Sequence, residues 1–176
     1  MTPESNHGTP SAPLAVRMRP RGLDEIAGQS RLLVAGSPLR SLASESSQSS
    51  VSVILWGPPG TGKTAFGRWL AQQIGCPLHV KRASDLLGMY VGENEKNIAH
   101  AFEQAEAENA VLLIDEVDSF LQDRQGAQRS WEVSLVNEML TQMESFGGVF
   151  IASTNLMGQL DAAVLRRFGP LPHRVA

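Results

Sequence analysis

The chain has 176 residues, of which 42% are apolar, and a formal net charge of −3 at pH 7. This length suits one domain with a sizeable core, and the apolar fraction is ordinary for a globular protein. No apolar run approaches the roughly 18 residues that a membrane-spanning helix needs. The small negative charge excludes a general attraction to nucleic acid, and residues 1–13 are too polar for a signal peptide.

The only cysteine, Cys76, excludes an intramolecular disulfide framework and fits a reducing compartment. Together with the polar N-terminus and the absence of an apolar span, it predicts a cytoplasmic protein with no membrane partner. The histidines are scattered without metal-ligand spacing, so no zinc site is predicted.

The first 50 residues are predicted to lie outside the compact core. Residues 1–13 are rich in Pro, Ser and Thr and are expected to be a disordered tail. Residues 14–50 form a basic arm, with a helix that starts near Pro38 and a serine-rich connector after it. A solvated face explains the arginines of this arm as well as a DNA contact does.

From residue 51 to residue 176, apolar runs alternate with segments of helical periodicity. This alternation predicts an α/β fold, with a parallel sheet covered by helices on both faces. The predicted strands span residues 51–56, 77–81, 110–115 and 149–153, and the predicted helices span residues 63–74, 93–108, 130–145 and 161–167.

The first strand leads directly into a glycine-rich loop with the pattern G-x-x-x-x-G-K-[ST]. Such a loop directs backbone N–H groups and a helix N-terminus at phosphate oxygens, while its lysine reaches the β- and γ-phosphates. Its last hydroxyl is a Mg²⁺ ligand. The predicted phosphate-binding residues are Gly57, Pro58, Pro59, Gly60, Thr61, Gly62, Lys63 and Thr64.

A second apolar strand ends in two adjacent acids, Asp115 and Glu116. Because ligands lie beyond the carboxyl ends of parallel strands, Asp115 is expected to meet the Mg²⁺ held by Thr64. Glu116 is placed to polarise an attacking water. The alternative is a plain glycine turn and a solvated strand end. Both motifs together favour a P-loop NTPase, a three-layer αβα sandwich with ATP and Mg²⁺ as ligands.

Four segments resemble an AAA-type ATPase of the AAA+ superfamily: residues 115–121 (DEVDSFL), 136–144 (VNEMLTQME), 152–155 (ASTN) and 160–168 (LDAAVLRRF). By this resemblance Asn155 is the sensor that helps to place the lytic water. Arg166 and Arg167 match arginine fingers, which act on a neighbouring subunit's nucleotide and raise the rate by about 10³–10⁵. The alternative for the arginine pair is a solvated helix end.

The two halves of the chain resemble different branches of this superfamily. Residues 65–168 are similar to protein-remodelling AAA ATPases, in which Tyr90 and Val91 correspond to a pore loop that grips polypeptide. Tyr90 could instead be a packing residue, and residues 122–129 correspond either to a second pore loop or to a solvated turn. Residues 13–64 are similar to the replication-associated recombination protein A family, in which the backbone around Ile26 and Ala27 wraps the adenine.

In the family a strand follows the arginine fingers and a helical lid then covers the nucleotide. Here two prolines in residues 169–175 disfavour strand pairing, and the sequence ends at Ala176 before any lid. We therefore expect an AAA+ core that forms only a weak ring by itself. Three functions remain open: an ATPase that remodels proteins, an ATPase of DNA replication or recombination, and a core that binds nucleotide with little turnover.

Overall fold

The computed structural model describes residues 50–88, 90, 92–119, 121, 130–168 and 173–174. The predicted tail and nearly all of the predicted arm and connector lie outside these residues. In chain order the elements are β1 (Val51–Trp56), α3 (Lys63–Ile74), β2 (Leu78–Arg82), α4 (Ala83–Leu86), α5 (Glu93–Ala107), β3 (Val111–Asp115), η2 (Val117–Ser119), α6 (Ser130–Ser145), β4 (Val149–Thr154), η4 (Met157–Gln159), α7 (Ala162–Arg167) and β5 (His173–Arg174).

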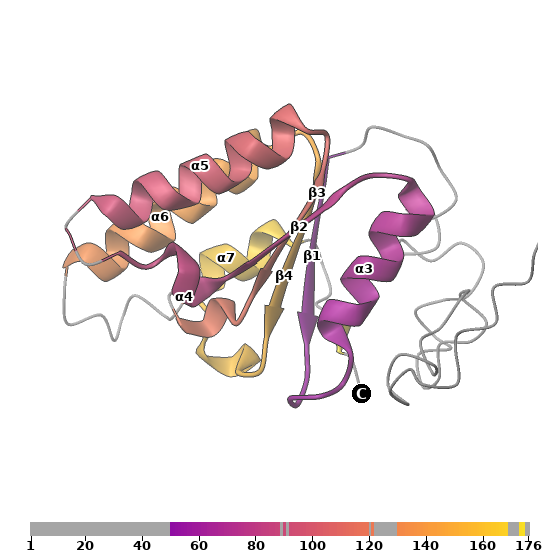
Figure 1. Cartoon of the computed structure of the whole chain (residues 1–176). Helices are drawn as coiled ribbons and strands as arrows, with labels where there is room; N and C mark the ends of the chain where they lie inside the picture. The colour runs from indigo at the N-terminus through magenta and orange to yellow at the C-terminus, as the bar shows by residue number, and fades with distance from the viewer. Residues whose placement is uncertain are drawn as a thin grey trace, which may run out of the picture.

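The strands form one sheet in the order β2-β3-β4-β1-β5, and every pair is parallel. Helix α3 covers one face of the sheet, and α5, α6 and α7 cover the other (Figure 1). The predicted α/β class with its parallel sheet and three layers is confirmed. Since all strands run the same way, the carboxyl ends of β1, β3 and β4 meet at one edge.

Alternate residues of the central strands β1, β3 and β4 enter different cores, because successive side chains of a strand point to opposite faces. Val53, Leu55 and Leu113 pack with Trp69 and Leu70 of α3 in the smaller core. The larger core lies under the helices of the other face and includes Ile54, Leu112, Ile114, Ile98, Phe102, Phe150 and Val164. The central strands therefore read as continuous apolar runs, as expected for strands buried on both faces.

Helix α3 approaches the sheet closely at Gly67. A methyl group at this position would overlap Leu113, which is fully buried and cannot easily move aside. The helix ends at Gly75, which has φ 78° and donates its N–H to the carbonyls of Ala71 and Gln72. Glycine is favoured there because the left-handed conformation has no Cβ penalty. The predicted bounds of α3 are confirmed.

Several predicted boundaries shift by one residue for local reasons. Strand β2 begins at Leu78, since Pro77 has no N–H to donate and contributes only its carbonyl, which accepts from Val111 N at 2.8 Å. Helix α7 begins at Ala162 because the Asp161 carboxylate caps it and accepts from Ala163 N at 2.7 Å.

Four elements differ from the sequence prediction. The short helix α4 and the three-residue helices η2 and η4 were not predicted, because three or four residues carry too little periodicity to reveal them. Strand pairing after the arginines was predicted to be disfavoured by proline, and this was wrong. His173 and Arg174 pair in parallel with Leu55 and Trp56. This pairing starts immediately after Pro172, where the missing proline N–H no longer interrupts the ladder.

Phe102 provides a test of the larger core. Its buried ring lies 5.3 Å from the ring of Phe146 and 5.2 Å from that of Phe150, centre to centre. We expect Phe102→Ala to lower the free energy of unfolding by about 3–5 kcal/mol, because a cavity replaces these contacts. Urea denaturation followed by circular dichroism measures the change. The exposed neighbour variant Glu103→Ala should stay within about 0.5 kcal/mol of the parent, and equal values for both variants would contradict this core.

Candidate functional site

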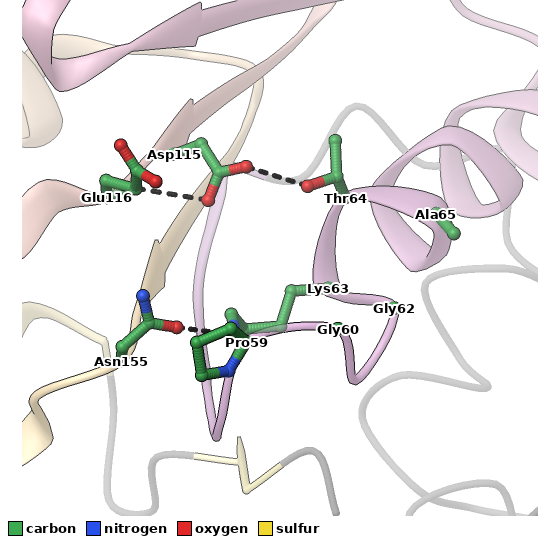
Figure 2. Close-up of a pocket in the computed structure, with 9 residues that line it drawn as sticks. All are labelled: Pro59, Gly60, Gly62, Lys63, Thr64, Ala65, Asp115, Glu116 and Asn155. Atoms are coloured by element: carbon green, nitrogen blue, oxygen red, sulfur yellow. Dashed lines mark hydrogen bonds between the residues drawn. The ribbon is translucent and has the colours of Figure 1, made fainter.

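A pocket of about 330 Å³ opens at the carboxyl ends of β1, β3 and β4. Its lining comes from the glycine-rich loop, the start of α3 and the residues that follow β3 and β4 (Figure 2). The lining residues are Pro59, Gly60, Gly62, Lys63, Thr64, Ala65, Asp115, Glu116 and Asn155. The fold thus brings the predicted phosphate loop, both predicted acids and the predicted sensor residue to one place.

The loop after β1 is held in a left-handed geometry that suits glycine. Gly60 and Gly62 have φ values of 82° and 84°, which a side chain would strain. Thr61 Oγ1 donates to the Pro58 carbonyl at 2.9 Å and closes the turn. Among the residues that the structure describes, no side chain caps the first turn of α3, whose residues line the pocket. A helix start of this kind attracts anions through its N–H groups and its dipole.

Lys63 is a buried lysine whose ammonium has three acceptors. Its Nζ donates to Gly57 O at 2.9 Å, to Pro58 O at 3.0 Å and to Asn155 Oδ1 at 2.9 Å. These bonds match the three donors of an ammonium, which would otherwise be costly to bury. Lys63 thereby ties the loop after β1 to the end of β4, 92 residues away in sequence.

The Asp115 carboxylate is the centre of a second set of bonds. Thr64 Oγ1 donates to its Oδ2 at 2.7 Å, and the Ser153 hydroxyl and the Glu116 N–H donate to its Oδ1. Ser153 is fully buried and was not singled out from the sequence. It lies beside Asp115 because Ile114 and Ala152 are paired in the sheet.

Glu116 adopts a left-handed backbone conformation, with φ 60°. For a residue with a side chain this conformation costs roughly 1–2 kcal/mol, and such strain gathers at functional sites. The Glu116 carbonyl accepts from Ser119 N at 3.1 Å and from Ser119 Oγ at 2.8 Å, which holds the turn in place. The exposed Glu116 side chain consequently stands at the pocket and not in the core.

Asp118 is a site-adjacent residue for which the sequence suggested no role. Its Oδ1 accepts from Thr154 Oγ1 at 2.7 Å and from Asn155 N at 3.2 Å. Thr154 Oγ1 accepts in turn from Leu156 N at 3.0 Å. One feature of the sequence could have indicated this residue: it is an acid three residues after Asp115, in the turn that follows the same strand.

The oxygen atoms at the pocket fit a magnesium ion. The Thr64 hydroxyl and the Asp115 carboxylate lie 2.7 Å apart, and Mg²⁺ is bound in proteins by one or two such oxygens with water and substrate phosphates. A transition-metal site would instead need several His, Cys or carboxylate side chains around one point. Within the described ranges, no group of three His, Cys, Asp or Glu side chains could hold a metal ion.

Comparison with known proteins agrees with this geometry. The sequence model of the AAA family, described as the ATPase family associated with various cellular activities, matches residues 53–171. The chain belongs to the AAA family of ATPases. Its enzyme class is accordingly that of the ATPases.

Relatives of this AAA domain include much longer proteins. It is 38% identical over 122 residues to an ATP-dependent zinc metalloprotease FtsH of Lachnoclostridium phytofermentans, covering 65% of the chain and 21% of that protein. It is 36% identical over 119 residues to protein mac-1 of Caenorhabditis elegans, covering 65% and 15%. It is 40% identical over 156 residues to an uncharacterized AAA domain-containing protein of Mycobacterium tuberculosis, covering 85% and 33%. The chain thus spans about a third or less of these relatives.

These comparisons do not show the resemblance of residues 13–64 to the replication-associated recombination protein A family, which stays a prediction. Ile26 and Ala27, the predicted adenine contacts, lie outside the described residues, as do Val91 and residues 122–129. None of the helices in the described part of the chain has both the length and the apolar character needed to cross a membrane.

Arg166 and Arg167 of the AAA domain lie on α7 and do not line the pocket of their own chain. Arg166 Nε donates to the Ala162 carbonyl of the same helix at 3.1 Å, and Arg167 pairs with Glu144 of α6. Both arginines are exposed. An exposed ion pair contributes about 0–1 kcal/mol, so Arg167 can leave Glu144 at little cost.

Tyr90 is 74% exposed, so its packing alternative is not supported. It precedes α5, and its loop is held by hydrogen bonds to the backbone and side chains of the first turn of that helix. Gly88 N donates to Asn94 Oδ1 at 2.5 Å, Tyr90 N donates to Glu93 Oε2 at 3.3 Å, and Glu93 N donates to Tyr90 O at 3.2 Å.

A separate hydrogen-bonded pair lies at the opposite end of the sheet from the pocket. His79 Nε2 is 2.8 Å from Glu108 Oε2. The hydrogen bond with His79, followed by that from Gln104, lowers the pKa of the exposed Glu108 carboxyl. The pair joins β2, at the edge of the sheet, to the end of α5.

Proposed function

We propose that this AAA domain binds Mg-ATP in the pocket after β1 and hydrolyses it to ADP and phosphate. The observation that carries the proposal is the convergence of Lys63, Thr64, Asp115, Glu116 and Asn155 on one pocket. Family membership supports the same ligand. The glycine-rich loop, residues 57–64, would surround the phosphates with N–H groups and the positive end of α3.

Lys63 would contact the β- and γ-phosphates. To do so its ammonium exchanges carbonyl acceptors of the loop for phosphate oxygens, which form stronger, charge-assisted bonds. Thr64 and Asp115 would hold Mg²⁺, which when bound offsets negative charge on the phosphate oxygens. The bonds from Ser153 and the Glu116 N–H hold the Asp115 carboxylate in the orientation that this task requires.

Glu116 is the proposed general base. Its carboxylate would take a proton from water as the water oxygen attacks the γ-phosphorus, and the bond from that phosphorus to the β-phosphate oxygen breaks. Asn155, which follows the neighbouring strand β4 and lies on the same side of the pocket as Glu116 in Figure 2, would orient the water and contact the γ-phosphate. The exposed Glu116 side chain lines the pocket, which supports its role as general base.

Arg166 and Arg167 are proposed to complete the site of a neighbouring subunit in a homo-oligomeric ring. Two features support this role: both side chains are exposed, and neither lines the pocket of its own chain.

The exposed Tyr90 favours polypeptide as the substrate that the ATPase remodels, and the proposed compartment is the cytoplasm. Association with DNA is the second candidate, supported by the arginines of residues 14–50. Salt-dependent DNA binding would distinguish it.

Nucleotide binding is tested through Lys63. Mg-ATP should raise the melting temperature of the parent, because a ligand at 100 times its Kd stabilises the folded state by about 2.7 kcal/mol. Lys63→Ala should abolish this shift, while Lys96→Ala, which removes an exposed lysine of α5, should retain it. Differential scanning fluorimetry measures both, with circular dichroism to verify folding. A parent melting curve unchanged by millimolar Mg-ATP would rule out the proposed ligand.

The role of Glu116 separates binding from chemistry. Glu116→Gln should bind ATP as the parent does while phosphate release falls at least about a hundredfold, as expected for loss of a positioned base. Glu106→Gln, an exposed position on α5, is the matched control. Hydrolysis at the parent rate in Glu116→Gln would show that another group activates the water.

The arginine pair is tested by dilution. If Arg166 and Arg167 act between subunits, specific ATPase activity should rise with protein concentration. Replacing both by alanine should lower the maximal rate by about 10³-fold or more, with ATP affinity retained. Arg68→Ala, at an exposed position of α3, controls for lost surface charge. A monomer, verified by light scattering, with brisk activity independent of dilution would contradict action in trans.

A further inference from the structure

Asn155 lies one residue beyond the regular sheet. Strand β4 ends at Thr154, whose pairing with Trp56 closes the ladder between β4 and β1. Within the described part of the chain, the backbone of Asn155 pairs with no strand that would set its direction. Its N–H instead donates to Asp118 Oδ1 at 3.2 Å, from the turn that follows β3.

The Asp118 carboxylate also restrains the residues before and after Asn155. It accepts from Thr154 Oγ1 at 2.7 Å, and that hydroxyl accepts from Leu156 N at 3.0 Å. Thr154 is fully buried, so water cannot replace Asp118 as the acceptor of its hydroxyl proton. The segment from Thr154 to Leu156 is thus fixed by one carboxylate and one hydroxyl.

This fixed segment aims the Asn155 side chain across the pocket. Asn155 Oδ1 accepts from Lys63 Nζ at 2.9 Å, so the amide lies beside the ammonium that is proposed to contact the γ-phosphate. An amide that contacts the γ-phosphate must be positioned to within a fraction of an ångström. Hydrogen bonds to the backbone that carries it supply that precision.

We propose that Asp118 is a positioning residue for Asn155, which lets the site distinguish ATP from ADP. The inference rests on the proposed nucleotide-binding function. Asp118 and Glu116 follow the same strand, but their tasks differ: Glu116 lines the pocket, whereas Asp118, among the described residues, does not line it and bonds to Thr154 and Asn155.

The test compares affinities for a non-hydrolysable Mg-ATP analogue and for Mg-ADP by isothermal titration calorimetry. Asn155→Ala should reduce the preference for the analogue by about tenfold, the value of one hydrogen bond to a charged group, with ADP affinity unchanged. Asp118→Ala should cause the same loss. The double variant should lose no more than either single variant, because both changes remove one function.

Two hydroxyl variants separate positioning from folding. Thr154→Val removes the bonds to Asp118 and Leu156 without changing side-chain size and should reproduce the loss, whereas Thr154→Ser should retain the preference. Asp85→Ala is the matched control, since it removes an exposed carboxylate that accepts from a backbone N–H, Arg82 N at 3.0 Å, away from the pocket.

The inference is overturned if Asp118→Ala keeps the full preference, if it weakens both nucleotides equally, or if its loss adds to that of Asn155→Ala. A parent that binds both nucleotides with equal affinity would overturn it while nucleotide binding stands. A parent that binds neither would overturn the proposed function, and the inference with it.

Discussion

The hydrogen bonds to the Asp115 carboxylate are the interactions on which the site depends. They come from the first turn of α3, from the end of β4 and from the backbone after β3, so one side chain joins three segments. A carboxylate that is half removed from water needs such donors, and bonds to a charged group contribute about 1.5–3 kcal/mol each. The same donors leave Asp115 oriented toward Thr64. The same hydrogen bonds therefore stabilise the strand ends and orient Asp115 for a cation.

The parallel sheet makes that arrangement possible, because it gathers several strand ends at one edge. Lys63 and Asp115 each reach across this edge, and together they link β1, β3 and β4 (Figure 2). The apolar strands behind them form two cores that hold the edge rigid. Polar groups that would be costly to bury alone form hydrogen bonds with one another here. Such hydrogen bonds strengthen one another where the dielectric is low.

Lys63, Thr64 and Asp115, which are proposed to hold the chain's own nucleotide and its Mg²⁺, are held inside this network, whereas the arginines proposed to act on a neighbour are exposed. Arg166 and Arg167 are exposed, one bonded to a carbonyl of its own helix and the other in a surface ion pair with Glu144. This division suits a protein in which each pocket is finished by another subunit. The weak pair between Arg167 and Glu144 costs little to exchange for a phosphate group or a partner surface.

The sequence by itself determined the α/β class, the bounds of α3 and the loop of residues 57–64, because hydrophobic periodicity and short motif spacing are local signals. It also located Asp115, Glu116 and Asn155. Only the tertiary structure showed that Ser153 and Asp118 support them, at separations of 38 residues from Asp115 and 37 from Asn155. Likewise, the pairing of strand β5 with β1 and the four-residue helix α4 became visible only in the tertiary structure. The physical reason is register: a strand's own residues do not state which neighbour it pairs with, and a shift of one position would exchange Ser153 for a side chain of the opposite face.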